Sequence, residues 1–176
     1  MRACELDVTV RKPGNVSVAS PGHRMRAEQF VASAVAAAAA LFETRTTVGE
    51  RIERAVAATH AAVGCNTNLG IVLLMAPLAA AAERRGALDS EAALQGALSD
   101  VLAALNPADA RAAYRAITMA NPAGLGRVAE ADVSFVPRIG LREAMALDHL
   151  QAYIPREVQE SYQQKGEAVT APPAQV

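Results

Sequence analysis

Residues 63–78 read VGCNTNLGIVLLMAPL and set three small polar side chains, Asn66, Thr67 and Asn68, against one of the most apolar runs in the chain. We expect a buried helix over residues 68–84, for which Thr67 or Asn68 can act as the N-cap. The first N–H groups of that helix stay free and the helix dipole adds partial positive charge, so the helix start can bind an anion. A well-capped buried helix without a ligand also explains the apolar run, but it leaves the surplus of asparagine unexplained.

Helical patterns extend outward from this stretch. Residues 47–62 carry an apolar stripe at helical spacing, with Thr47 and Glu50 as a capping box at the start. The charged residues Arg51 and Arg54 lie off the stripe, and Glu50 forms an i,i+4 pair with Arg54. This segment therefore predicts a helix with an apolar face and a charged face.

The signals are helical throughout the chain, and Asn106 with Pro107 predicts the N-cap and first residue of a later helix. We expect an all-α fold, a single globular domain of about seven helices over residues 1–165, followed by a Pro/Ala-rich disordered tail at 166–176. The expected helices cover residues 26–43, 47–62, 68–84, 90–104, 107–120, 140–152 and 156–164.

Composition excludes several classes of protein. The chain has 17 Lys and Arg against 18 Asp and Glu, so a basic nucleic-acid-binding surface is not expected. Hydrophobic residues make up 52% and aromatic residues 3%, and much of the apolar share is alanine, which favours packed helices over a β-sandwich. The apolar stretches fall short of the roughly 18 residues of a membrane span. With no signal peptide and two cysteines that suit free thiols, we expect a soluble cytoplasmic protein.

Three further loops carry residues that could do chemistry. Lys12 and Asn15 flank a Pro-Gly turn that suits a phosphate, although the same turn can simply end a helix. His23 lies in a loop flanked by Gly and Pro, where a ligand contact and plain exposure are both open. Residues 121–127 place two glycines and Arg127 after a helix, either as a shaped loop or as a C-cap followed by a connection.

Common catalytic motifs are absent from the sequence. It contains no P-loop, nucleophile elbow, HExxH, CxxC or GxGxxG pattern. The acidic candidates for metal binding or base catalysis are Glu50, Glu53, Glu130 and Asp132, and their spacing singles out none of them. Residue types and spacing alone therefore leave the reaction open.

Taken in order, however, four motifs resemble those of one enzyme family. They are KPGNVS with PGHRM at residues 12–25, VGERI with ATHAAVGCNTNLG at 48–70, MANPAGLG at 119–126 and LREAMAL at 141–147. The series resembles the triphosphoribosyl-dephospho-CoA synthase family, and more narrowly its branch from methylotroph-type bacteria. The resemblance runs from about Ala3 to Leu147.

The resemblance implies an all-helical transferase that joins ATP to 3′-dephospho-CoA. A ribose 2′-hydroxyl of dephospho-CoA attacks C1 of the ATP ribose, and adenine leaves. His23 becomes the candidate for acid/base catalysis or phosphate contact.

In this interpretation the other candidates bind the nucleotide. The triphosphate implies Mg²⁺, with Glu50 or Asp132 as direct or water-mediated ligands. The residues expected to contact phosphates or ribose, by charge or by neutral hydrogen bonds, are Lys12, Asn15, Asn66, Thr67, Asn68, Gly70 and Arg127.

The sequence departs from the citrate-lyase branch of that family. The branch typically reads NTHKG where this chain reads NTNLG, so Asn68 and Leu69 replace His and Lys. It also carries an Asp between the His and the Met of the earlier motif, which GHRM at residues 22–25 lacks. Two alternatives follow: a related enzyme that acts on another acceptor in pterin-type one-carbon cofactor synthesis, or a nucleotide- or CoA-binding module with impaired catalysis.

The ends of the chain also differ from the family pattern. Family members usually start one helix earlier and continue past the point equivalent to Leu147, so we expect a truncated member. Apolar faces left unburied by missing helices would favour dimerisation. The expected partners are ATP and dephospho-CoA or a similar acceptor, with a second copy of the chain, and neither nucleic acid nor a membrane.

Overall fold

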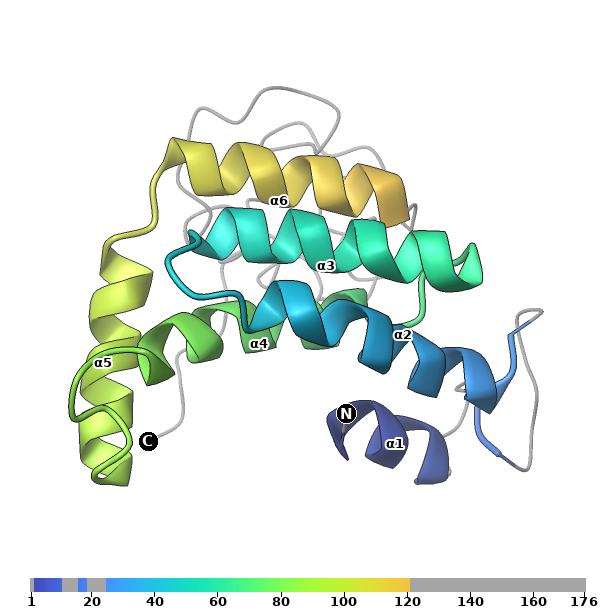
Figure 1. The fold of residues 1–176 in the computed structure, drawn as a ribbon, viewed down its shortest axis with the longest axis horizontal. Coiled ribbons are helices and arrows are strands. Elements are labelled where there is room, and N and C mark those ends of the chain that lie inside the picture. The colour runs from blue at the N-terminus through green and yellow to red at the C-terminus, as the bar shows by residue number, and fades with distance from the viewer. Residues whose placement is uncertain (1, 11–15, 19–24, 121–176) are drawn as a thin grey trace, which may run out of the picture.

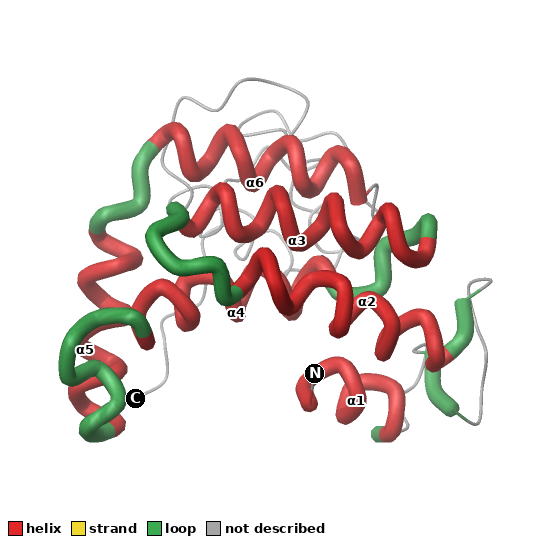
Figure 2. Tube along the Cα trace, in the orientation of Figure 1, coloured by secondary structure: helices red, strands yellow, loops and turns green. Residues whose placement is uncertain are grey.

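The computed structural model describes residues 2–10, 16–18 and 25–120, and in these ranges it contains six α-helices and no strand. The prediction of an all-α fold is confirmed, and the five expected helices in this part begin and end within two residues of their predicted bounds. The helices expected at 140–152 and 156–164, the domain boundary near residue 165 and the tail lie outside the described residues. The six helices are α1 (Arg2–Thr9), α2 (Ala27–Leu41), α3 (Val48–Val63), α4 (Leu69–Ala82), α5 (Glu91–Ala103) and α6 (Pro107–Ala120) (Figures 1 and 2).

Helix α1 is the described helix that the sequence did not predict. It has eight residues, and an isolated helix of that length is not stable in water. Packing holds it in place, because Cys4 and Val8 are buried and Val8 packs with Val16, Ala27 and Phe30. Burial also raises the pKa of the Cys4 thiol, which favours the protonated form of this free cysteine.

Helix α3 lies at the centre of the bundle. Helices α2, α4 and α6 all pack against it, while α5 packs against α4 and α1 against α2 (Figure 1). The core is built largely of alanine around a few larger side chains, among them Ile52, Val56 and Val72. Small alanine side chains let helices approach closely, which is how a chain with 3% aromatic residues encloses a core.

Helices α3 and α6 run parallel, and a hydrogen bond joins their first turns. Gly49 N–H donates to Asp109 Oδ1 at 2.8 Å, and Asp109 Oδ2 accepts from Asn106 N–H at 3.1 Å. One carboxylate therefore serves the amino ends of two helices, where negative charge is favourable. Further along, Arg115 forms a two-point ion pair with Glu53, at 2.6 and 2.7 Å. The predicted helix start at Asn106 is confirmed, since its Oδ1 accepts from the first turn of α6.

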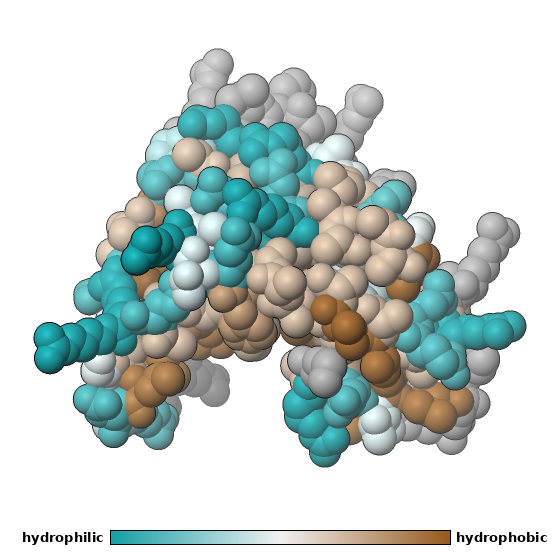
Figure 3. Space-filling model, in the orientation of Figure 1, coloured by the Kyte–Doolittle hydropathy of each residue, from teal (hydrophilic) through white to brown (hydrophobic). Residues whose placement is uncertain are grey.

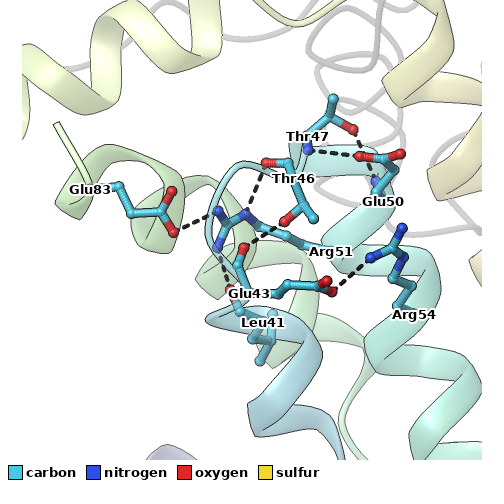
Figure 4. Close-up of polar contacts among 8 residues, drawn as sticks. All are labelled: Leu41, Glu43, Thr46, Thr47, Glu50, Arg51, Arg54 and Glu83. Carbon is cyan, nitrogen blue, oxygen red and sulfur yellow. Dashed lines mark hydrogen bonds and ion pairs between the residues drawn. The ribbon is translucent and has the colours of Figure 1, made fainter.

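A buried arginine ties the ends of α2 and α4 to α3 (Figure 4). The Arg51 side chain is 1% exposed; it donates to Leu41 O at 2.7 Å and Thr46 O at 3.3 Å, and it pairs with Glu83 at 2.6 Å. The sequence pattern assigned Arg51 to the charged face of α3, and that assignment is wrong. Arg51 is buried because its guanidinium satisfies carbonyls that the end of α2 and the following loop leave free.

The charged residues at the start of α3 pair differently from the sequence prediction. The capping box is confirmed: Glu50 N–H donates to Thr47 Oγ1 at 3.2 Å and Thr47 N–H donates to Glu50 Oε2 at 2.9 Å. The predicted ion pair of Glu50 with Arg54 is replaced by a pair of Arg54 with Glu43, at 2.7 Å (Figure 4). The Glu50 carboxylate turns back to the Thr47 backbone, so its attraction to Arg54 acts without a close ion pair.

The outer face of α2 is apolar. After Gln29 the helix carries one polar residue, Ser33, and that residue is buried. Val31, Val35 and Phe42 are exposed, and Figure 3 shows a tan and brown surface over this helix. None of the helices in the described part of the chain has the length and apolar character that a membrane span requires.

Candidate functional site

The ends of α3 and α6 and the starts of α2 and α4 lie at one end of the bundle, which we call the loop end (Figure 1). Because α6 runs parallel to α3, its last residue, Ala120, lies beside the final turns of α3. The loop of residues 64–68 connects α3 to α4 here. It contacts the first turn of α2, where Gln29 Nε2 lies 3.6 Å from Cys65 Sγ.

Helix α1 reaches the loop end as well. Its last turn is joined to the following segment, because Val18 N–H donates to Val8 O at 3.0 Å. Val8 also packs against Ala27 and Phe30 in the first turns of α2. The sequence analysis singled out four loops, around residues 12–15, 22–25, 64–68 and 121–127. The described residues that adjoin these loops therefore lie together at the loop end.

The 64–68 loop reverses the chain and caps α4. Gly64 ends α3 in the left-handed region, with φ of 70°, where glycine is favoured. Asn66 Oδ1 accepts a hydrogen bond from Leu69 N–H at 3.2 Å. The capping side chain is therefore Asn66, and not Thr67 or Asn68 as the sequence suggested; Asn68 holds the N-cap position, but its side chain makes no bond to the helix.

Thr67 and Asn68 point into the bundle instead. Thr67 Oγ1 donates to Ser33 Oγ at 2.5 Å, and Ser33 Oγ donates to Gln29 O at 2.6 Å. Thr59 Oγ1 donates to Asn68 Oδ1 at 3.1 Å. All four hydrogen-bonding side chains are buried, and burial of polar groups is tolerated only when they are paired in this way. The loop is thus fixed to α2 through Thr67 and to α3 through Asn68.

The first turn of α4 keeps hydrogen-bond donors that no described residue uses. The N–H groups of Leu69 and Val72 bond to residues 66–68, whereas those of Gly70 and Ile71 have no partner in the described ranges. Gly70 is exposed, and a Cβ placed there would meet nothing within 4 Å. Helix α4 also has no acidic residue in its first turn, while each of the other five described helices has one. The positive end of its dipole is therefore left without a balancing side chain in its own first turn.

Five of the predicted site residues lie outside the described residues, namely Lys12, Asn15, His23, Arg127 and Asp132. Among the predicted residues that are described, the structure brings together Asn66, Thr67, Asn68 and Gly70. Val10 and Val16 are the described residues next in sequence to the segment that contains Lys12 and Asn15. Met25 is the described residue nearest in sequence to His23, and Ala120 is nearest to Arg127. These described residues adjoin the loop end.

Glu50 lies away from this group. It is in the first turn of α3, about 20 Å along the helix axis from Val63 at a rise of about 1.5 Å per residue. Hydrogen bonds from the Thr47 backbone and hydroxyl lower the pKa of Glu50, as a capping carboxylate requires. In the described ranges no three His, Cys, Asp or Glu side chains gather in a way that could hold a metal ion. A metal-binding role for Glu50 stays a prediction.

Sequence reasoning missed the buried partners of the loop, Ser33 and Thr59. Thr59 belongs to the apolar stripe of α3, and Ser33 interrupts the alanine run of α2. A polar residue at a buried helix position signals a hydrogen-bond partner. Both residues gave this signal, but only the fold shows their partners: Asn68 lies 9 residues from Thr59, and Thr67 lies 34 residues from Ser33.

A comparison with protein families identifies one match. The model of the family CitG, described as ATP:dephospho-CoA triphosphoribosyl transferase, matches residues 1–170 of the chain. The matched range contains all the motifs quoted above and continues past Leu147. No curated protein and no solved structure matches the chain.

Proposed function

The chain belongs to the CitG family of ATP:dephospho-CoA triphosphoribosyl transferases, and we propose that the loop end of its helix bundle binds the triphosphate and ribose of ATP. The family reaction moves the triphosphoribosyl group of ATP to dephospho-CoA. The observation that carries the proposal is the first turn of α4. Two of its N–H groups have no partner among the described residues, Gly70 is exposed, and the turn lacks an acidic residue.

The reaction defines what the site must do. Transfer breaks the bond between C1′ of the ATP ribose and adenine, and it forms a bond between C1′ and an acceptor hydroxyl oxygen. Adenine leaves with the bonding electron pair and gains a proton, while the attacking hydroxyl loses one. Because positive charge develops at C1′, the protein must orient the ribose and assist both proton movements. We propose His23 as the acid or base, and the ribose 2′-hydroxyl of dephospho-CoA as the acceptor.

In this proposal the start of α4 binds phosphate. Free N–H groups and the positive end of the helix dipole favour an anion, and a triphosphate is strongly anionic. The open space at Gly70 allows a phosphate oxygen to approach the backbone closely. Lys12 and Arg127 would add positive charge from the chain segments that adjoin the loop end.

Neutral hydrogen bonds would orient the ribose. Asn15 and Asn68 carry amide groups suited to ribose hydroxyls or phosphate oxygens. Asn66 and Thr67 contribute by holding the loop, since Asn66 caps α4 and the Thr67 hydroxyl is bonded to Ser33.

We propose that Mg²⁺ arrives with ATP. Mg²⁺ keeps several waters and is usually bound by substrate phosphates with one or two carboxylates, and not by an all-protein cage. That mode suits a loop end whose described residues include no acidic cluster. The candidate carboxylates are Asp132, which follows α6 in the sequence, and Glu50, which lies in the first turn of α3.

We also propose a cytoplasmic homodimer. The exposed Val31, Val35 and Phe42 on α2 support an interface between copies. The balance of 17 basic and 18 acidic residues gives no basis for binding nucleic acid. Sedimentation velocity should show a species of twice the 18.3 kDa chain mass, and a monomer at all concentrations would rule the dimer out.

Calorimetric titration with ATP and Mg²⁺ tests the site. Asn68→Ala should weaken ATP binding at least about 10-fold, as loss of one ligand hydrogen bond in a buried position does. The control is Glu91→Gln at the start of α5, which should leave ATP binding unchanged. An unchanged ATP affinity in N68A would remove the loop end from the proposal.

A further inference from the structure

We infer that Thr59 is a positioning residue, which holds Asn68 so that Asn68 turns its hydrogen-bond donors toward ATP. The inference rests on the proposed function, because it concerns the same start of α4. Thr59 and Asn68 are 2% and 4% exposed, and they meet between α3 and the 64–68 loop.

The orientation of the Asn68 amide follows from its contact with Thr59. Thr59 Oγ1 donates to Asn68 Oδ1 at 3.1 Å. Oxygen and nitrogen of a carboxamide point in different directions from one carbon, so a fixed Oδ1 turns Nδ2 away from Thr59. No described residue accepts a hydrogen bond from Nδ2, and Nδ2 is not among the fully enclosed atoms without a partner. Nδ2 therefore keeps its donors unused by the described residues.

This orientation suits a phosphate or a ribose oxygen. Asn68 is the N-cap residue of α4, and the N–H groups of Gly70 and Ile71 in the first turn have no partner among the described residues. We infer that the Nδ2 donors and these N–H groups serve the same ligand. A reversed Asn68 would present an oxygen to the acceptor-only phosphate and would repel it. The buried hydroxyl of Thr59 thus helps to decide whether the residue beside the phosphate is a donor.

Ser33 provides the matched comparison. It fixes the loop by accepting from the neighbouring Thr67 at 2.5 Å, in a bond as buried as the one between Thr59 and Asn68. The Thr67 hydroxyl is engaged in that bond, so the loss of Ser33 loosens the loop without turning a ligand donor. Ser33→Ala therefore measures the effect of a loosened loop alone.

The test is a double-mutant cycle on the full chain, read as the Kd for ATP with Mg²⁺ by calorimetry. Thr59→Val, which keeps the volume and removes the hydroxyl, should raise Kd about 10-fold, while Thr59→Ser should stay within about 2-fold of the parent chain. Thr59→Val should add nothing in the N68A background, because its effect passes through Asn68. Ser33→Ala should raise Kd less than Thr59→Val does.

The outcomes separate this inference from the proposed site. If N68A weakens ATP binding and Thr59→Val does not, or if Thr59→Val acts equally in the N68A background, the positioning role is wrong and the site stands. If N68A itself leaves the Kd unchanged, the proposed site fails and the inference fails with it. Melting temperatures show whether each variant is folded at the assay temperature, and Thr59→Ala replaces Thr59→Val if the latter does not fold.

Discussion

Asp109 Oδ1 accepts a hydrogen bond from Gly49 N–H at 2.8 Å, at a point where α6 lies close enough that a Cβ on Gly49 would be 2.5 Å from Asp109 Cα. This contact, with the Glu53–Arg115 pair further along, sets α6 parallel to α3. Parallel helices finish at the same end, so Ala120 arrives beside the final turns of α3, after which the 64–68 loop follows. A contact at one end of the bundle thereby determines which segments meet at the other.

Gly49→Ala should destabilise the fold. The added methyl group would overlap the Asp109 backbone, so α3 and α6 must separate, at a cost of about 2–3 kcal/mol in the free energy of unfolding. Urea denaturation measures the loss. Gly96→Ala on α5 is the control, because a Cβ there meets nothing within 4 Å, and it should stabilise by about 0.5–1 kcal/mol. If G49A raised the free energy of unfolding as much as G96A does, the close approach of α3 and α6 at Gly49 would be contradicted.

Asn66→Ala should lose both stability and ATP binding. Removal of the cap of α4 should cost about 1 kcal/mol of unfolding free energy, and the loop that holds Asn68 should loosen. The comparison is Ser90→Ala, which removes the cap of α5 at Ala93 N–H and should cost a similar amount without affecting ATP binding. Equal ATP affinity in the two variants would show that Asn66 acts only as a cap.

Gly70→Asp and Gly70→Asn should both stabilise the fold but should differ in ATP binding. Both remove a glycine from an exposed first turn with room for a side chain, which should stabilise α4 by a few tenths of a kcal/mol, and Asp adds about 0.3–1 kcal/mol through the helix dipole. The Asp carboxylate would occupy the proposed phosphate position, and its negative charge would repel the phosphate. Titration with ATP should therefore give a Kd at least about 10-fold higher for G70D than for G70N. Matching Kd values would mean that no phosphate lies near Gly70.

The ion pair of Glu53 with Arg115 should make stability depend on pH in a defined direction. The hydrogen bond from Arg115 lowers the pKa of Glu53 below its ordinary value of 4.5. A carboxylate with a lowered folded-state pKa stabilises the fold above its unfolded pKa, and that stabilisation is lost as pH falls through the folded value. Glu53→Gln should therefore be less stable than the parent chain near neutral pH, by no more than about 1 kcal/mol since Arg115 is 58% exposed. The difference should shrink as pH falls below 4.5 in urea titrations, and a difference that grows on acidification would contradict the assignment.

Much of the fold could be predicted from the sequence because its signals are local. The stripe of α3, the capping box at Thr47 and the start of α6 at Asn106 depend on residues within a few positions of one another. Arg51 was assigned wrongly because its burial depends on Glu83, 32 residues away, and on carbonyls of α2 and the loop that follows it. Helix α1 depends on packing against α2, and periodicity within eight residues cannot show that.

The candidate site was predictable in part for the same reason. The sequence singled out residues 66–70, and the structure gathers them at the start of α4. It could not show that Asn66 caps the helix or that Thr67 and Asn68 turn inward. Both features depend on the direction in which the chain leaves Gly64, and only the assembled helices fix that direction.

Release of free adenine tests the central claim most directly. The purified chain is incubated with ATP, Mg²⁺ and dephospho-CoA, and adenine is measured by chromatography beside an identical reaction with N68A. We expect one adenine for each dephospho-CoA consumed, at a rate that falls at least about 10-fold in N68A when ATP is below its KM. A chain that binds ATP but yields no adenine above the level seen without dephospho-CoA would contradict triphosphoribosyl transfer by this protein.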